Sequence, residues 1–148
     1  MRQFNAWELC RMSARFFVFA GAVSAALSVA LSAAFAHLPV FAGGIPAMVQ
    51  SALQLQQFHA VGVVLVGLVL GWRGPSRWLL ASGVLMLAGT VMFSFNIYAR
   101  SVLGFDALRF AVPWGGSAWI LAWLLLAAGA VSQGSAERSS APTNSHRQ

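Results

Sequence analysis

Two histidines have the widest choice of chemistry in this sequence. His37 and His59 bound a stretch without a charged residue, and neutral imidazole is a common ligand of haem iron and metal ions. At one depth on neighbouring helices, the two rings could ligate a b-type haem, hold a metal ion with Asp106, or contact a quinone. Alternatively, each ring lies at a helix end and bonds only to backbone or glutamine. The sequence has no CxxCH, HExxH or four-ligand spacing that favours a cofactor.

Other polar side chains are predicted at the depth of the two histidines. Asn96 and Tyr98 could bond His59 across the bundle, and Arg100 could pair with Asp106. Since polar groups within a membrane are functional candidates by default, these residues are candidates for a site. The candidate outer-leaflet polar cluster consists of His37, Gln56, His59, Asn96, Tyr98, Arg100 and Asp106.

The sequence gives little sign of catalysis. No apolar run contains an acidic residue, which weakens a proton or ion relay. The serine and threonine hydroxyls within the runs have no positioned base beside them, so none is expected to act as a nucleophile. We therefore predict no catalytic residue, no bound metal and no enzymatic activity.

Composition indicates where these residues lie. Hydrophobic residues make up 59% of the 148 residues and charged residues only 8%, whereas soluble domains carry about 25% charged residues. The net charge is +6, and all nine basic residues are arginines. They stand between apolar runs and form no basic face, so they indicate membrane topology and not nucleic-acid binding.

Four apolar runs are each long enough to cross a bilayer, which requires about 20 helical residues. A chain this short satisfies its backbone amides in lipid with helices, so an all-α, four-helix membrane bundle is predicted. Residues 34–36 resemble a signal-peptidase site, but the first run is longer than a signal peptide's apolar region of about 7–15 residues, so we expect a retained helix. The predicted spans are residues 16–36, 50–72, 78–99 and 110–131.

The arginines predict orientation. With the N-terminus inside, seven arginines lie on the cytoplasmic side, and only Arg100 and Arg109 lie outside. This bias follows the positive-inside rule. Residues 1–15 are then a cytoplasmic segment, and residues 132–148 have the composition of a disordered cytoplasmic tail. The cytoplasmic arginines are Arg2, Arg11, Arg15, Arg73, Arg77, Arg138 and Arg147.

Small residues recur along the predicted helices. Association in lipid depends on close packing between small residues, so these positions are expected to form helix interfaces within one bundle. Alternatively, one of these surfaces stays free for a partner or a second copy. The predicted packing residues are Gly21, Gly67, Gly71, Gly89, Gly115 and Gly116.

These residues resemble the YgdD-like family of small membrane proteins, domain of unknown function four-two-three. The resemblance covers about residues 21–130 and implies an inner-membrane four-helix protein without an established activity. Phe35, Leu55 and the Phe95-Asn96 step depart from the family pattern. The matching elements are Ala36-His37, Gln56 with His59-Ala60, Gly89 with Phe93-Ser94 and Tyr98, and Pro113, Gly115 and Gly116 with the run from Trp123 to Ala127.

Three functions stay open. The first is a non-enzymatic accessory or small-ligand- or partner-binding subunit, without a cofactor. The second is a haem- or quinone-linked redox component that uses His37 and His59. The third is an oligomeric small-solute transporter. The expected partners are the lipid bilayer and possible membrane-protein partners or further copies of the chain, and no nucleic acid.

Overall fold

The computed structural model describes the backbone of residues 6–139 and the side chains of residues 7–132. Every regular element in this part of the chain is helical, which confirms the predicted all-α class. The elements are α1 (Ala6–His37), a 3-10 turn η1 (Pro39–Phe41), α2 (Ala47–Arg73), α3 (Arg77–Thr90), a π-helical turn η2 (Val91–Phe95), α4 (Asn96–Leu103) and α5 (Ala111–Ser139).

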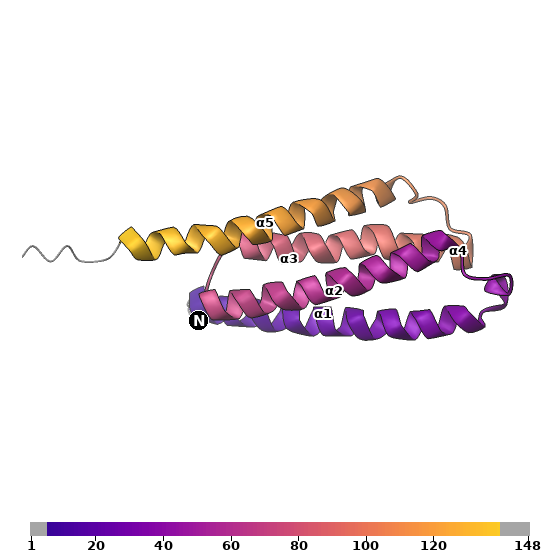
Figure 1. Cartoon of the computed structure of the whole chain (residues 1–148), viewed down its shortest axis with the longest axis horizontal. Coiled ribbons are helices and arrows are strands. Elements are labelled where there is room, and N and C mark those ends of the chain that lie inside the picture. Colours follow the sequence, from indigo (N-terminus) through magenta and orange to yellow (C-terminus); the bar gives the residue numbers. More distant parts are fainter. Residues whose placement is uncertain (1–5, 140–148) are drawn as a thin grey trace, which may run out of the picture.

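The helices run side by side along the long axis of the molecule (Figure 1). α1 packs against α2, α3 packs against α5, and α2 and α3 join the two pairs. The start of α1, the α2–α3 turn and the end of α5 share one end, here called the terminal end. The connections from α1 to α2 and from α4 to α5 lie at the opposite, loop end (Figure 1).

Four helical segments are long and apolar enough to cross a membrane. The shortest has 22 residues, which at 1.5 Å per residue reach about 33 Å, enough for a hydrocarbon core of about 30 Å. The third segment is continuous from Arg77 to Leu103 and includes α3, η2 and α4. The four predicted spans are therefore present as helices.

The helices extend beyond the predicted spans. α1 begins at Ala6, so residues 6–15 belong to the first helix, and α5 continues to Ser139, although a disordered tail was predicted from residue 132. Residues 1–5 and 140–148 lie outside the described part of the chain.

Glycine and serine set two of the helix ends. Gly74 ends α2 with a φ of 92°, and its N–H donates to the carbonyl of Leu70. The Ser76 hydroxyl caps α3 by accepting from the N–H of Leu79. Such a short turn requires α2 and α3 to run antiparallel, as the sequence predicts.

The bundle has apolar residues outside and polar residues within. Phe19, Leu68 and Trp72 are exposed, whereas Gln56 and Ser82 are completely buried. In water this distribution would leave apolar surface uncovered, but in lipid the exposed side chains contact acyl chains. The buried polar groups bond between helices, for example the Ser82 hydroxyl to the carbonyl of Ala122, at 2.7 Å.

Four of the predicted packing glycines lie where two helices meet closely. A Cβ atom at Gly21 would lie 2.7 Å from the Ala60 carbonyl oxygen, and one at Gly67 would lie 2.8 Å from the Ala14 carbonyl oxygen. Gly89 and Gly115 face each other between α3 and α5 in the same way. Gly71 packs more loosely, since its Cβ would lie 3.6 Å from that of Ala14.

Gly116 does not pack against a helix, contrary to the prediction. A Cβ atom there would have no neighbour within 4 Å among the residues described. Consecutive residues of an α-helix point about 100° apart. Because Gly115 faces α3, Gly116 points to the side of that contact.

Candidate functional site

His37 and His59 do not form a pair. Gly21 of α1 is level with Ala60 of α2, and His37 lies 16 residues beyond Gly21, or about 24 Å along α1. His37 is exposed at the helix end, whereas His59 lies near the middle of α2. The two rings therefore cannot ligate one iron, and the prediction of a common depth was wrong because the register between α1 and α2 cannot be read from the sequence.

His59 is held inside the bundle by a hydrogen bond and a stacked ring. Its side chain is 4% exposed, and its Nδ1 lies 2.7 Å from the carbonyl oxygen of Leu55. Because that oxygen only accepts, Nδ1 carries the hydrogen, and Nε2 of the neutral ring is an acceptor. The described residues provide no partner for Nε2. The imidazole stacks on the Trp119 indole, with centroids 3.9 Å apart and an angle of 6°.

A cavity of about 320 Å³ lies beside His59, between α2, η2 and α5. Phe58 and Ile120 are 58% and 67% exposed on the lipid-facing surface, so the cavity opens toward the bilayer. Its volume is at the lower end of the range for small-molecule sites, about 300–1,000 Å³. We call it the aromatic cavity; it is lined by Leu55, Phe58, His59, Phe93, Gly116, Trp119, Ile120 and Trp123.

The two tryptophans fix one wall of the aromatic cavity. Trp119 donates from Nε1 to the carbonyl oxygen of Met86, at 3.1 Å, which ties α5 to α3. The indole nitrogen of Trp123 is buried and has no hydrogen-bond partner within the described structure. Neither tryptophan was predicted as a site residue. Their spacing of four, which places them on one face of a helix, was the available signal.

A second polar group lies closer to the loop end and joins three helices. The Gln56 amide nitrogen donates to the Ser24 carbonyl of α1, at 3.1 Å, and its amide oxygen accepts from the Tyr98 hydroxyl of α4, at 2.9 Å. Nearby, the Ser94 hydroxyl donates to the carbonyl of Ala52, at 3.0 Å. Tyr98 was predicted to bond His59, and this was wrong. Gln56 is one helical turn nearer the loop end and meets Tyr98 first.

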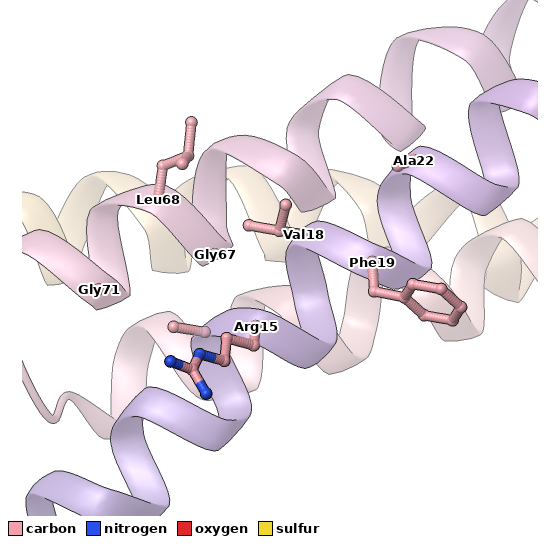
Figure 2. A pocket seen from close by; sticks show the side chains of 8 residues that line it. Arg15, Val18, Phe19, Ala22, Gly67, Leu68 and Gly71 are labelled. Carbon is pink, nitrogen blue, oxygen red and sulfur yellow. The ribbon is translucent and has the colours of Figure 1, made fainter.

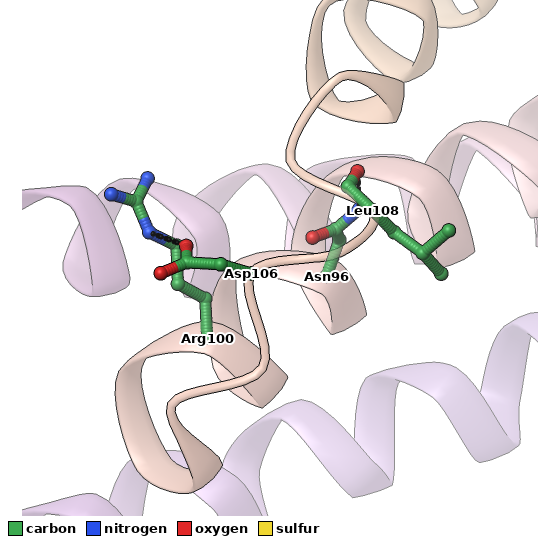
Figure 3. Close-up of polar contacts among 4 residues, drawn as sticks. All are labelled: Asn96, Arg100, Asp106 and Leu108. Atoms are coloured by element: carbon green, nitrogen blue, oxygen red, sulfur yellow. Dashed lines mark hydrogen bonds and ion pairs between the residues drawn. The ribbon is translucent and has the colours of Figure 1, made fainter.

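The remaining predicted site residues fix the connection between α4 and α5 (Figure 3). Asn96 donates to the carbonyl of Leu108, at 2.5 Å, and so does not reach His59 as predicted. Arg100 and Asp106 form the expected ion pair, with 2.7 Å between Nε and Oδ1. Both side chains are well exposed, so the pair contributes only about 0–1 kcal/mol. None of these three residues lines the aromatic cavity.

These features define an integral membrane protein with four apolar helices, a polar interior and a lateral aromatic cavity. The chain belongs to the family described as Protein of unknown function (DUF423), whose model matches residues 32–116. The resemblance predicted from the motifs is thereby confirmed.

Relatives match most of the chain. The UPF0382 inner membrane protein YgdD of Escherichia coli (strain K12) is 30% identical over 122 residues, which cover 81% of this chain and 92% of the relative. The UPF0382 membrane protein YwdK of Bacillus subtilis (strain 168) is 32% identical over 119 residues, or 78% and 95% of the two chains. No solved structure matches the chain. Together with the four apolar helices, these relatives identify a multi-pass protein of the bacterial inner (plasma) membrane.

Proposed function

We propose that this chain is a non-enzymatic membrane protein that binds a small apolar molecule in the aromatic cavity, as an accessory subunit of a membrane process. The observation that carries the proposal is the buried His59 ring, which lines a cavity open to the bilayer. An imidazole at this depth is costly to keep. Its Nε2 has no partner in the described structure, and a ligand hydroxyl could supply one.

The lining specifies the class of ligand. Phe58, Phe93 and Trp119 provide ring faces and edges, which favour a ligand with a planar ring. His59 Nε2 would accept from a hydroxyl, and the Trp123 N–H would donate to a carbonyl after a small ring movement. A hydrophobic ring compound with one or two oxygen substituents matches this set.

The absence of enzymatic activity is part of the proposal. The ring neighbours of His59 are Phe58, Trp119 and Trp123, and none of these side chains is a nucleophile or a carboxylic acid. A histidine that acts as a base needs a group to deprotonate and a geometry that positions both. The cavity therefore supports binding better than chemistry.

A quinone-linked redox role is the second candidate. The aromatic cavity favours it, because a quinone has the ring and the oxygen substituents that the lining would accept. In this redox role, His59 would contact the quinone, and His37 would take no part. The haem version loses its main support, because the two histidines are not level.

We expect Gly116→Leu to abolish ligand binding, because its side chain would extend into the aromatic cavity. Apolar molecules that co-purify from native membranes are extracted and counted by mass spectrometry. Wild type should retain a molecule that Gly116→Leu loses at least tenfold. The control, Ser117→Leu, places the same leucine side chain at the next, exposed position of α5 and should retain the molecule. Equal amounts in wild type and Gly116→Leu would contradict the proposal.

A defined probe separates the two candidates. A ubiquinone with one isoprenoid unit is added to the purified protein, and the melting temperature is followed by tryptophan fluorescence. Ligands that bind only the folded state raise the melting temperature. A rise in wild type that Gly116→Leu lacks would favour the quinone-linked role. A co-purified molecule without any quinone effect would leave binding in place and reject that role.

We also propose that both termini are cytoplasmic. The arginine distribution supports this: Arg11, Arg15, Arg73 and Arg77 lie toward the terminal end, against Arg100 and Arg109 at the loop end. A C-terminal green fluorescent protein fusion should therefore fluoresce in cells, and a C-terminal alkaline phosphatase fusion should be inactive. Active phosphatase with a dark fluorescent fusion would reverse the orientation.

A further inference from the structure

A second, larger hollow lies between α1 and α2. Its volume is about 550 Å³, and it is lined by Ala14, Arg15, Val18, Phe19, Ala22, Gly67, Leu68 and Gly71. The small side chains on both helices leave this space open. Figure 2 shows Arg15 and Gly71 at one end and Ala22 at the other. We call it the α1–α2 groove.

Arg15 lies at the boundary of the hydrocarbon. It is the last charged residue of α1 before the uncharged run of residues 16–36, which at 1.5 Å per residue spans about 32 Å. On α2, Trp72 follows Gly71 and is 81% exposed, with the Arg73 guanidinium 5.4 Å from its ring centroid. Tryptophan and arginine at one level are typical of the membrane interface. Both helices therefore place the headgroup level at the Arg15 end of the α1–α2 groove.

The length of the groove corresponds to one leaflet. From Ala14 to Ala22 there are eight residues, or about 12 Å along α1. Half of a hydrocarbon core of about 30 Å is about 15 Å. An acyl chain in the groove would thus run from the headgroup level toward the midplane. Its headgroup would lie beside Arg15.

The charge of Arg15 selects the headgroup. The side chain is exposed, and it forms no ion pair with an acidic side chain among residues 7–132. A guanidinium presents paired donors that match the two free oxygens of a phosphate. From these observations we infer that the α1–α2 groove binds an anionic glycerophospholipid, one acyl chain lying along Leu68 and Gly71 and the phosphate facing Arg15.

A second copy of the chain fits this groove less well. Copies in one membrane share their orientation, so a twofold axis would run along the membrane normal, and each residue would meet its equivalent at the same depth. A dimer centred on the groove would bring the two Arg15 side chains together in the interface. Like charges there would repel, whereas a phosphate neutralises the charge.

The test uses the full-length protein in detergent, titrated with phosphatidylglycerol or with phosphatidylcholine of the same acyl chains, and native mass spectrometry counts bound lipid. Wild type should retain one phosphatidylglycerol in preference to phosphatidylcholine. Arg15→Gln should weaken phosphatidylglycerol binding at least tenfold. The control, Arg11→Gln, removes the same charge one turn away and outside the groove. Arg11→Gln should weaken phosphatidylglycerol binding by no more than roughly fivefold, which is the effect of one basic residue near an anionic surface.

A second variant tests the acyl-chain part of the groove. Gly71→Leu is expected to fold, because a Cβ atom there makes only ordinary contact, 3.6 Å from that of Ala14. The melting temperature of Gly71→Leu in lipid-free detergent should equal that of wild type. The variant should nevertheless no longer bind phosphatidylglycerol. Equal losses in Arg15→Gln and Arg11→Gln would overturn the inference, because they indicate surface charge alone. A lipid-free dimer that Gly71→Leu abolishes would also overturn it and assign the groove to a second copy.

Discussion

Gly115→Ala is expected to destabilise the protein, whereas Gly116→Ala is expected to leave it as stable or slightly more stable. The two substitutions add the same methyl group at neighbouring positions of α5. A Cβ atom at Gly115 would lie 2.8 Å from the backbone nitrogen of Phe93 and 3.1 Å from the carbonyl oxygen of Gly89. Backbone atoms cannot rotate away, so α5 must separate from α3 and η2. At Gly116, apart from its chain neighbours and the adjacent backbone of α5, no atom of the described structure lies within 4 Å of the added carbon.

The two substitutions are expected to change the free energy of unfolding in opposite directions. Overpacking at Gly115 should lower the free energy of unfolding by about 1–3 kcal/mol. Gly116→Ala should raise it by up to about 1 kcal/mol, since alanine favours a helix over glycine. Unfolding of each variant in mixed micelles, followed by tryptophan fluorescence, measures the difference. Equal stabilities for the two variants would mean that α3 and α5 are not in close backbone contact.

Gln56→Met should destabilise the bundle more than the same change at Gln57. Methionine has nearly the volume of glutamine but forms neither of the two Gln56 hydrogen bonds. The Tyr98 hydroxyl and the Ser24 carbonyl would each lose one partner inside the bundle. Hydrogen bonds between helices in membranes contribute about 0.6 kcal/mol on average and up to about 1.7 kcal/mol. We therefore expect a loss of about 1–3 kcal/mol.

The neighbour Gln57 supplies the matched control, because its side chain is exposed on the same helix. Gln57→Met should change the free energy of unfolding by no more than about 0.5 kcal/mol. A double-mutant cycle of Gln56→Met with Tyr98→Phe isolates the bond between the two side chains. A coupling energy near zero, or a larger loss at Gln57, would show that Gln56 does not join the helices in this way.

For the aromatic cavity, residue types alone predicted one site residue but not its partners. His59 was identified from its type, since an ionisable ring in an apolar helix stands out. Its partners were misassigned, because they depend on how far α2 is rotated about its own axis. The predicted spans are apolar on all faces, so their periodicity gives no direction for any side chain. Trp119 therefore went unrecognised as the residue that stacks on His59.

The π-helical turn could not be predicted from the sequence either. Val91–Phe95 continues an apolar run that was predicted as one regular helix. In the structure, Phe93 packs against Gly115 and Trp119 at this turn, and π-helical turns frequently occur at functional sites. The irregularity depends on the contact with α5, which belongs to a distant part of the chain.

The sequence by itself determined that the chain crosses the membrane four times. Each crossing is a local property, because a helix in lipid satisfies its own backbone bonds, and length and hydropathy suffice to identify it. Tertiary structure alone decided that His37 and His59 lie at different depths, that Gly115 packs while Gly116 faces a cavity, and that Tyr98 meets Gln56. These outcomes depend on the register and rotation of helices that are almost uniformly apolar, and only their mutual packing sets both.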